Sequence, residues 1–307
     1  MISVKNITKR FAQFTAVNRL SFDVNPGDVV GFLGPNGAGK STSMKMITGF
    51  LPPDSGEVLV NGQSVTTSPQ EVQQQIGYLP EGAPAYGDMT VLAFLNFIAE
   101  VRQIDAQLKS HRIADVVAKV ELSAVLDKPI ETLSKGFKRR VGLAQALIHD
   151  PAILILDEPT DGLDPNQKHQ VRNLIKNLAK DKIVIISTHI LEEVTAVCNR
   201  VVIISDGEKC FDDTPQALLQ KSRYYRAINL TLDKAVTGSV SELLPGGVQW
   251  EAGASENNLI LFPGAQTIQL HELENLFEGQ GYQVQQMHIE AGRLDEVFRT
   301  ITLKEAS

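Results

Sequence analysis

Eight consecutive residues of the chain have the composition of a phosphate-binding loop. They are Gly34-Pro35-Asn36-Gly37-Ala38-Gly39-Lys40-Ser41, and Thr42 follows them. In a Gly-x4-Gly-Lys-Ser/Thr pattern, backbone N–H groups surround a di- or triphosphate, the lysine reaches the terminal phosphates, and the hydroxyl coordinates Mg²⁺. The sequence therefore predicts that a nucleotide binds along residues 34–42, with Ser41 also a metal ligand.

The residues on either side of this loop support the same prediction. Residues 29–33 are an apolar run that suits a buried parallel strand, and residues 41–48 alternate small, basic and apolar side chains as a helix does. A strand, a glycine loop and a helix N-terminus form an anion site, because free N–H groups and the positive end of the helix dipole point at the phosphates. This context disfavours a glycine-rich turn without a ligand.

Three further polar residues follow apolar runs that are typical of parallel strands. Asp157 and Glu158 come after residues 153–156, and His189 comes shortly after residues 183–186. Ligands bind at the carboxyl ends of such strands, so we expect Asp157 to hold Mg²⁺ through water, Glu158 to polarise the attacking water, and His189 to contact the γ-phosphate. The alternatives are acids that only solvate a strand end and a histidine with an ordinary polar partner.

A second phosphate-binding nest is predicted at Ser134 and Gly136, which precede a helical stretch over residues 138–148. The chain already has one phosphate loop, so a second nest needs a second nucleotide. A head-to-tail homodimer satisfies this requirement, because Ser134 and Gly136 of one copy then reach the nucleotide held by the other. An ordinary N-cap serine is the alternative.

The remaining patterns predict an α/β core with two additions. Residues 2–7, 20–24 and 57–60 are expected to form antiparallel strands, with a hairpin turn at Asn61-Gly62. Helical spacing from about residue 88 to 149 indicates a helical insertion, and parallel strands return at residues 153–156, 183–186 and 201–204 with a helix over 167–180 between the first two.

The pattern changes after about residue 220, which divides the chain into domains at 1–220 and 221–307. In the second part we expect strands at 227–232, 258–262 and 282–287, an amphipathic segment over 267–277 and a helix over 294–302. This tail is either a packing appendage or a dimerisation or regulatory domain, and its two histidines, His271 and His288, have no ligand spacing.

Composition limits the classes of function. The net charge of −7 and the pI near 5.4 argue against a nucleic-acid partner. No apolar run reaches the roughly 18 residues that cross a bilayer, and residues 1–6 do not read as a signal peptide, so any membrane role is expected to come through a partner. Cys198 and Cys210 lack metal spacing and indicate reduced packing residues in a cytosolic protein.

Six motifs in this order resemble those of the nucleotide-binding subunits of ABC transporters. Residues 34–41 resemble the Walker A motif, 155–158 the Walker B motif, 133–137 the signature, 161–164 the D-loop, 77–81 the loop that senses the membrane subunit, and His189 the switch histidine. The resemblance implies that Phe11 stacks on the adenine of ATP, that Asp164 contributes to the nucleotide site, and that Glu81 is an Mg²⁺ ligand.

Three positions depart from the commonest form of these motifs. Lys135 and Phe137 replace a glycine and the glutamine of Leu-Ser-Gly-Gly-Gln, and Glu81 replaces a glutamine. Phosphate contact at the signature relies on Ser134 and backbone N–H groups, so binding is expected to survive. Glutamate at position 81 still offers oxygen to Mg²⁺ but adds a charge and removes a donor.

These variants look most like the subgroup that serves ABC-2-type exporters, which includes gliding-motility-associated and multidrug ATPase subunits. The resemblance implies a P-loop NTPase (ABC ATPase) core of the α/β class, with an antiparallel β subdomain, a helical insertion and a small C-terminal α+β domain. It also implies ATP hydrolysis by a homodimer that energises a separate ABC-2-type transmembrane permease from the cytoplasmic face of the membrane. The alternatives are a soluble ABC ATPase that acts on ribosomes or DNA, and an ATP-gated regulatory module.

Overall fold

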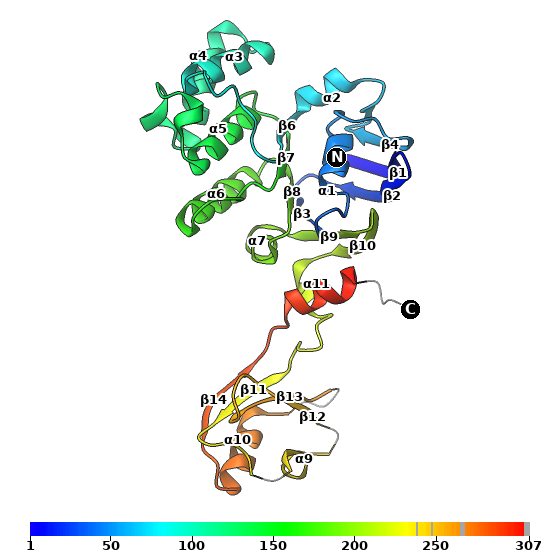
Figure 1. Ribbon diagram of the computed structural model, residues 1–307, viewed down its shortest axis with the longest axis vertical. Coiled ribbons are helices and arrows are strands. Elements are labelled where there is room, and N and C mark those ends of the chain that lie inside the picture. The colour runs from blue at the N-terminus through cyan, green and yellow to red at the C-terminus, as the bar shows by residue number, and fades with distance from the viewer. Residues whose placement is uncertain (238, 247, 265–267, 304–307) are drawn as a thin grey trace. The chain divides into compact units, whose positions relative to one another are not determined.

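The computed structural model describes residues 1–237, 239–246, 248–264 and 268–303, and it divides into two compact units (Figure 1). The first unit covers Met1–Pro215 and the second begins at Gln216. The division lies within the short helix α8 (Pro215–Leu219), slightly before the boundary expected after residue 220. The amphipathic segment expected over 267–277 starts outside the described residues, because residue 267 is not among them.

A six-stranded sheet forms the centre of the first unit, in the order β10-β9-β3-β8-β7-β6. All of its pairings are parallel except that of β10 with β9. The strands are β3 (Val29–Leu33), β6 (Ile76–Leu79), β7 (Ile153–Asp157), β8 (Ile183–Thr188), β9 (Arg200–Ser205) and β10 (Glu208–Asp213). The four predicted apolar strands are confirmed, because unbroken apolar runs can be buried on both faces of a parallel sheet.

A second, antiparallel sheet has the order β2-β1-β4-β5. Its strands are β1 (Ile2–Phe11), β2 (Phe14–Val24), β4 (Ser55–Val60) and β5 (Gln63–Ser64). The predicted hairpin at Asn61-Gly62 is confirmed, with φ of 49° and 82° at its two central residues. Both sheets contribute to one apolar core with helix α1 (Lys40–Ile47), and Phe22 meets Phe32 across it with ring centroids 5.5 Å apart.

The helical insertion lies between β6 and β7. It contains α3 (Val91–Val101), α4 (Ala106–Lys119) and α5 (Lys135–Leu147), each with an N-cap side chain, namely Thr90, Asp105 and Ser134. Helix α5 begins three residues before the expected start because the hydroxyl of Ser134 accepts a hydrogen bond from the N–H of Phe137. The other helices of this unit are α2 (Pro69–Gln75), α6 (Pro165–Leu178) and α7 (Leu191–Val197).

The second unit has a four-stranded antiparallel sheet in the order β12-β13-β11-β14. Its elements are β11 (Ile228–Leu232), α9 (Val240–Leu243), β12 (Gln249–Ala252), β13 (Asn258–Phe262), α10 (Leu270–Gly279), β14 (Val284–Ile289) and α11 (Leu294–Thr302). Up to β14 this is the β-α-β-β-α-β arrangement of ferredoxin-like domains. The α+β class expected from the alternating stretches is therefore observed.

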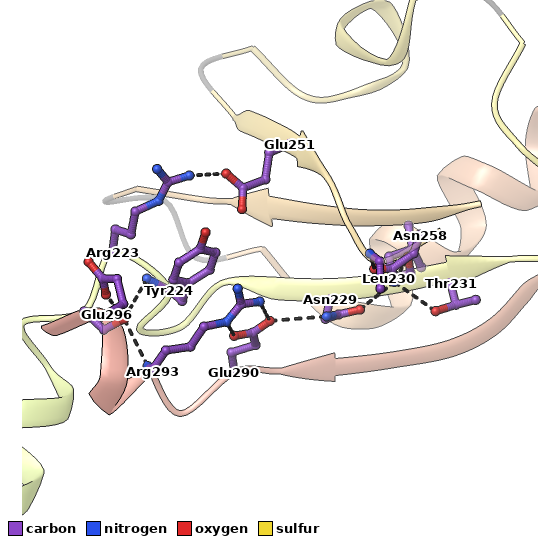
Figure 2. A network of polar contacts seen from close by, with 12 residues as sticks. Arg223, Tyr224, Asn229, Leu230, Thr231, Glu251, Asn258, Glu290, Arg293 and Glu296 are labelled. Carbon is purple, nitrogen blue, oxygen red and sulfur yellow. Dashed lines mark hydrogen bonds and ion pairs between the residues drawn. The ribbon is translucent and has the colours of Figure 1, made fainter. Parts of the chain in front are cut away.

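Polar side chains stabilise this second unit from inside (Figure 2). The amide nitrogen of the buried Asn258 lies 2.7 Å from Asn229 Oδ1, 3.1 Å from the carbonyl oxygen of Leu230 and 3.0 Å from Thr231 Oγ1. Nearby, Arg293 donates two hydrogen bonds to Glu290. These contacts join β11 to β13 and tie the end of β14 to the start of α11.

None of the helices within the described ranges combines the length and the apolar composition needed to cross a bilayer.

Candidate functional site

The phosphate loop has a backbone that only glycine fits. Gly37 and Gly39 have φ of 83° and 99°, in the left-handed region that other residues adopt at a cost. A Cβ at Gly39 would overlap the carbonyl oxygen of Ala16, and one at Gly34 would lie 2.5 Å from the carbonyl oxygen of Ile204. The loop is therefore packed against neighbouring backbone before α1 begins at Lys40, and this packing fixes where its N–H groups point.

Lys40 is almost fully buried at the start of α1. Its ammonium donates hydrogen bonds to the carbonyl oxygens of Gly34 at 2.8 Å and Pro35 at 3.2 Å. Burial lowers the pKa of Lys40, while the nearby carboxylates of Glu158 and Asp157 act in the opposite direction. A buried cation thus lies between the loop carbonyls and the acidic strand end.

One cavity of about 360 Å³ brings together most of the residues that the sequence singled out. It lies beside α1, and residues from four separate parts of the chain contribute to it, namely 11–16, 36–42, 81 and 158. Its lining consists of Phe11, Phe14, Ala16, Asn36, Gly37, Gly39, Lys40, Ser41, Thr42, Glu81 and Glu158. Phe14 was not expected. It is the cross-strand partner of Phe11 at the end of the β1–β2 hairpin, and both rings are largely exposed.

Oxygen donors suited to a hard divalent cation gather at the same place. Asp157 is 1% exposed, and its Oδ1 has no hydrogen-bond partner among the described residues. Ser41 and Glu81 line the cavity. A buried carboxylate oxygen without a protein partner fits a metal-bound water or a cation, and a hydroxyl and a second carboxylate are ligands that Mg²⁺ accepts. The part of the chain that the structure describes holds no group of three or more His, Cys, Asp or Glu side chains suited to a metal.

Glu158 and His189 face each other at the ends of β7 and β8. The Nδ1 atom of His189 lies 3.0 Å from the Oε1 atom of Glu158. Burial raises the pKa of the Glu158 carboxyl, and the neighbouring His189 and Lys40 partly offset this effect. Glu158 also has a φ of 51°, and its N–H donates to the carbonyl oxygen of Ser187 at 2.8 Å. A carboxylate with a raised pKa is a better proton acceptor than an ordinary one.

A buried glutamate that the sequence did not single out connects these two strand ends. Glu193, on α7, is 3% exposed, and its carboxylate accepts hydrogen bonds from the hydroxyls of Thr160 and Thr188. Thr188 directly precedes His189, and Thr160 follows Glu158 by two residues. The sequence signal that could have found Glu193 is an acid in a helix directly after a strand-end motif, but that signal does not distinguish a buried acid from a solvated one.

Ser134, Gly136 and Asp164 do not line this cavity. Ser134 caps α5, and Asp164 caps α6, where its carboxylate accepts from the N–H of Gln167 at 2.9 Å. A Cβ at Gly136 would lie 2.5 Å from Oε1 of Gln167, so the first turn of α5 packs closely on that of α6. Within a single chain these three residues therefore lie apart from the cavity at two helix N-termini, where Ser134 and Asp164 are exposed and Gly136 is buried.

A glycine loop between a buried parallel strand and a helix, with carboxylates at the end of a neighbouring strand, defines a P-loop nucleoside triphosphatase. Comparison with known proteins narrows this class. Residues 17–161 match the family model described as ABC transporter. The chain belongs to the ATP-binding proteins of the ABC transporter family, and it is an ATPase of that family.

Relatives at the level of sequence and structure agree with this assignment. The chain is 36% identical over 220 residues to Nod factor export ATP-binding protein I of Burkholderia orbicola (strain AU 1054), a match that covers 71% of this chain and 72% of the relative. It is 37% identical over 209 residues to linearmycin resistance ATP-binding protein LnrL of Bacillus subtilis (strain 168), covering 68% and 67% of the two chains. A solved ATP-binding subunit of an ABC transporter is 27% identical, with a TM-score of 0.67, and the match covers 72% of this chain and 92% of that chain.

Proposed function

We propose that this chain is the ATP-binding and ATP-hydrolysing subunit of an ABC-2-type exporter and that it energises transport by a separate permease. The observation that carries the proposal is the pair Glu158 and His189, 3.0 Å apart, with Glu158 lining the same cavity as Lys40 and the phosphate loop. This arrangement supplies a base, a polar group beside it and an anion site in one place.

Different residues bind the adenine ring, the phosphates and the metal ion of the nucleotide. Phe11 stacks on the adenine ring at the open end of the cavity, and the backbone of residues 34–42 with Lys40 holds the phosphates. Ser41, Asp157 and Glu81 hold Mg²⁺, which neutralises charge on the phosphate oxygens when bound. The exposed ring of Phe11 and the partnerless Oδ1 of Asp157 support these roles.

Hydrolysis depends on a water molecule aligned with the γ-phosphate. Glu158 accepts its proton, and the burial that raises the pKa of this carboxyl favours the transfer. His189 stabilises both the carboxylate of Glu158 and the γ-phosphate, and its position at the end of β8 fits this role because that strand is the direct neighbour of β7. Lys40 stabilises charge that develops on the phosphate oxygens.

A head-to-tail homodimer completes the site. Ser134 and Gly136 lie at the N-terminus of α5, and Asp164 at that of α6, and none of them reaches the cavity of its own chain. In the dimer they contact the nucleotide held by the second copy, where free N–H groups stabilise the γ-phosphate. ATP binding then closes the dimer, and closure moves the region of Glu81 that transmits force to the permease.

The names of two relatives support the proposed membrane partner and location. Both curated relatives are named as ATP-binding proteins, one of an export system and one of linearmycin resistance. We assign the chain to the cytoplasmic face of the cell membrane, attached through an ABC-2-type permease, and without a nucleic-acid partner. No observation favours the ribosome or DNA role or the purely regulatory role over this one.

Purified protein tests the proposal. Glu158→Gln should bind ATP, form an ATP-dependent dimer visible by light scattering, and hydrolyse ATP about 10²- to 10⁴-fold more slowly than the wild type. Lys40→Ala should lose ATP binding and dimer formation together. Unchanged turnover in Glu158→Gln would show that Glu158 is not the base. Normal hydrolysis by Lys40→Ala would contradict the role of the loop and Lys40 in phosphate binding.

The membrane partner needs a separate test. Affinity purification of the chain from detergent-solubilised membranes should recover a protein with several apolar spans of about 20 residues. Recovery of ribosomes or DNA instead would contradict the exporter role.

A further inference from the structure

Arg139 occupies an unusual environment for a cation. It lies on α5 and is only 5% exposed. Its guanidinium contacts no carboxylate within hydrogen-bond distance among the described residues. It donates instead to three backbone carbonyls, through Nη2 to Asp157 at 2.7 Å, Nε to Pro159 at 3.3 Å and Nη1 to Pro80 at 3.3 Å. Hydrogen bonds from a charged donor to a carbonyl oxygen are stronger than those from a neutral donor. A single buried guanidinium can therefore hold the backbone at Asp157, Pro159 and Pro80 together.

Two of these carbonyls flank Glu158, and the third precedes Glu81. The backbone of Glu158 has a φ of 51°, a left-handed conformation that is unfavourable for a non-glycine residue and persists only when the surroundings enforce it. Its N–H is fixed by the carbonyl oxygen of Ser187 on one side. Arg139 fixes the peptide group directly before Glu158 and, on the other side, the peptide group between Pro159 and Thr160. The direction of the Glu158 side chain therefore depends on Arg139 although the two side chains share no hydrogen bond.

Helix α5 is a rigid base for this contact. A Cβ at Gly142 would lie 2.6 Å from Leu79 and 2.8 Å from Ala83, and a Cβ at Gly77 would overlap the carbonyl oxygen of Ala146. The helix thus packs directly on β6 and the loop after it. Helix α5 cannot shift without disturbing this packing. The helix that carries Arg139 is therefore fixed, and so is the position of its guanidinium.

We propose that Arg139 is a positioning residue for ATP hydrolysis, which holds the backbone on both sides of Glu158 so that its carboxylate meets the attacking water. The inference rests on the proposed role of Glu158 as the base. Arg139 does not touch the nucleotide, since it is not part of the cavity lining. It therefore acts on the chemical step and leaves ATP binding nearly unchanged.

Kinetics on three variants test this role. In Arg139→Gln, one amide replaces the three-way contact, and kcat should fall about 10²-fold, which is the cost of moving a catalytic group by about 1 Å, while KM for ATP stays within about twofold. Arg139→Lys keeps the charge but has a single donor atom, and its kcat should fall by about tenfold. Arg140→Gln is the matched control, because the neighbouring Arg140 contacts Glu121, Gln170 and the carbonyl of Val120, away from the cavity, and its kcat should stay within about twofold of wild type.

A double variant separates positioning from a general loss of structure. If Arg139 acts through Glu158, adding Arg139→Gln to Glu158→Gln causes no further loss of kcat. The double variant and the Glu158→Gln single variant then have the same residual turnover. Multiplied losses overturn the proposal, and so does a kcat of Arg139→Gln or Arg139→Lys within twofold of the wild type. Turnover is expressed per bound ATP, so that an unfolded fraction cannot imitate the effect. An inactive wild type contradicts the proposed function as well, whereas an active wild type with unchanged Arg139 variants contradicts only this inference.

Discussion

His189 and Glu158 directly follow two neighbouring parallel strands, and the imidazole Nδ1 of the first lies 3.0 Å from the carboxylate of the second. The two strands are direct neighbours and Asp157 pairs with Ser187, so Glu158, directly after β7, and His189, directly after β8, leave the sheet at the same edge. The histidine side chain is 52% exposed and the Glu158 side chain 12%, so the pair has one largely buried member and one that is open to solvent.

His189→Ala is expected to lower kcat by on the order of 10²-fold, because it removes the partner of the proposed base and the proposed contact to the γ-phosphate. ATP affinity should change little, since the phosphate loop remains. His169→Ala is the control, because His169 is exposed on α6 and its ring lies 3.0 Å from the side-chain amide of Asn173, on the same helix. Steady-state measurement of kcat for ATP hydrolysis by both variants tests this prediction. Equal rates for the two alanine variants would show that His189 has no part in the reaction.

Glu193→Ala is expected to lower both stability and turnover. It leaves the hydroxyls of Thr160 and Thr188 without their acceptor, and an unsatisfied buried polar group costs about 1–3 kcal/mol. Thermal unfolding should shift down by several degrees. The neighbouring Glu192→Ala is the control because Glu192 is exposed. If Glu193→Ala melts at the same temperature as Glu192→Ala, the buried contacts do not stabilise this unit.

The sequence predicted the parts of this site that depend on local pattern. The glycine loop is specified by spacing within residues 34–41, and the carboxyl ends of unbroken apolar strands placed Glu158 and His189 at one edge. Arg139 and Glu193 were not predicted, because their partners lie 18–59 and up to 33 residues away and only the folded chain brings them together. Strand β6 was also missed, since it is short and contains Gly77.

Gly39→Ala is expected to weaken ATP binding by more than tenfold. Alanine would have to adopt a φ of 99° and would overlap the carbonyl oxygen of Ala16, so the loop must move. Gly27→Ala is the control for backbone strain alone. Gly27 also has a positive φ, of 87°, but a Cβ there would meet nothing within 4 Å, so this variant does not displace the phosphate loop. Titration with a fluorescent ATP analogue measures both. Wild-type affinity in Gly39→Ala would show that the loop geometry is not required for binding.

The stability of the first unit is expected to fall as the pH drops from 6.5 to 4. Burial lowers the pKa of His149 to about 4. Its Nε2 contacts the carbonyl oxygen of Ile76, and its Nδ1 has no hydrogen-bond partner among the residues that the structure describes. The unfolded chain binds a proton at this histidine below about pH 6.5, whereas the folded chain does not until about pH 4. The stability present above pH 6.5 is therefore lost across this window, by roughly 2 kcal/mol after allowance for partial exposure.

Urea unfolding of the wild type and of His149→Gln at a series of pH values measures how much His149 contributes to the pH dependence of the free energy of unfolding. The variant should show a shallower decline between pH 6.5 and 4, because glutamine does not titrate. His111→Gln, which removes an exposed histidine from α4, should decline as steeply as the wild type. Parallel curves for the wild type and His149→Gln would mean that His149 is protonated equally in the folded and unfolded chains.

Asn258→Ala is expected to destabilise the second unit by about 2–3 kcal/mol. The side-chain amide nitrogen of Asn258 lies within hydrogen-bond distance of Asn229, Leu230 and Thr231 (Figure 2). Its Oδ1 accepts a hydrogen bond from the N–H of Ala254 at 3.1 Å. Alanine leaves these groups buried without partners, at about 1–3 kcal/mol each where water cannot reach them. Gln285→Ala, on an exposed position of β14, is the control for a lost amide in the same sheet. Calorimetry of the whole chain should show an earlier transition for the second unit in Asn258→Ala alone. An unshifted transition would show that the core of this unit, built from residues such as Phe277 and Leu261, holds β11 to β13 without the amide.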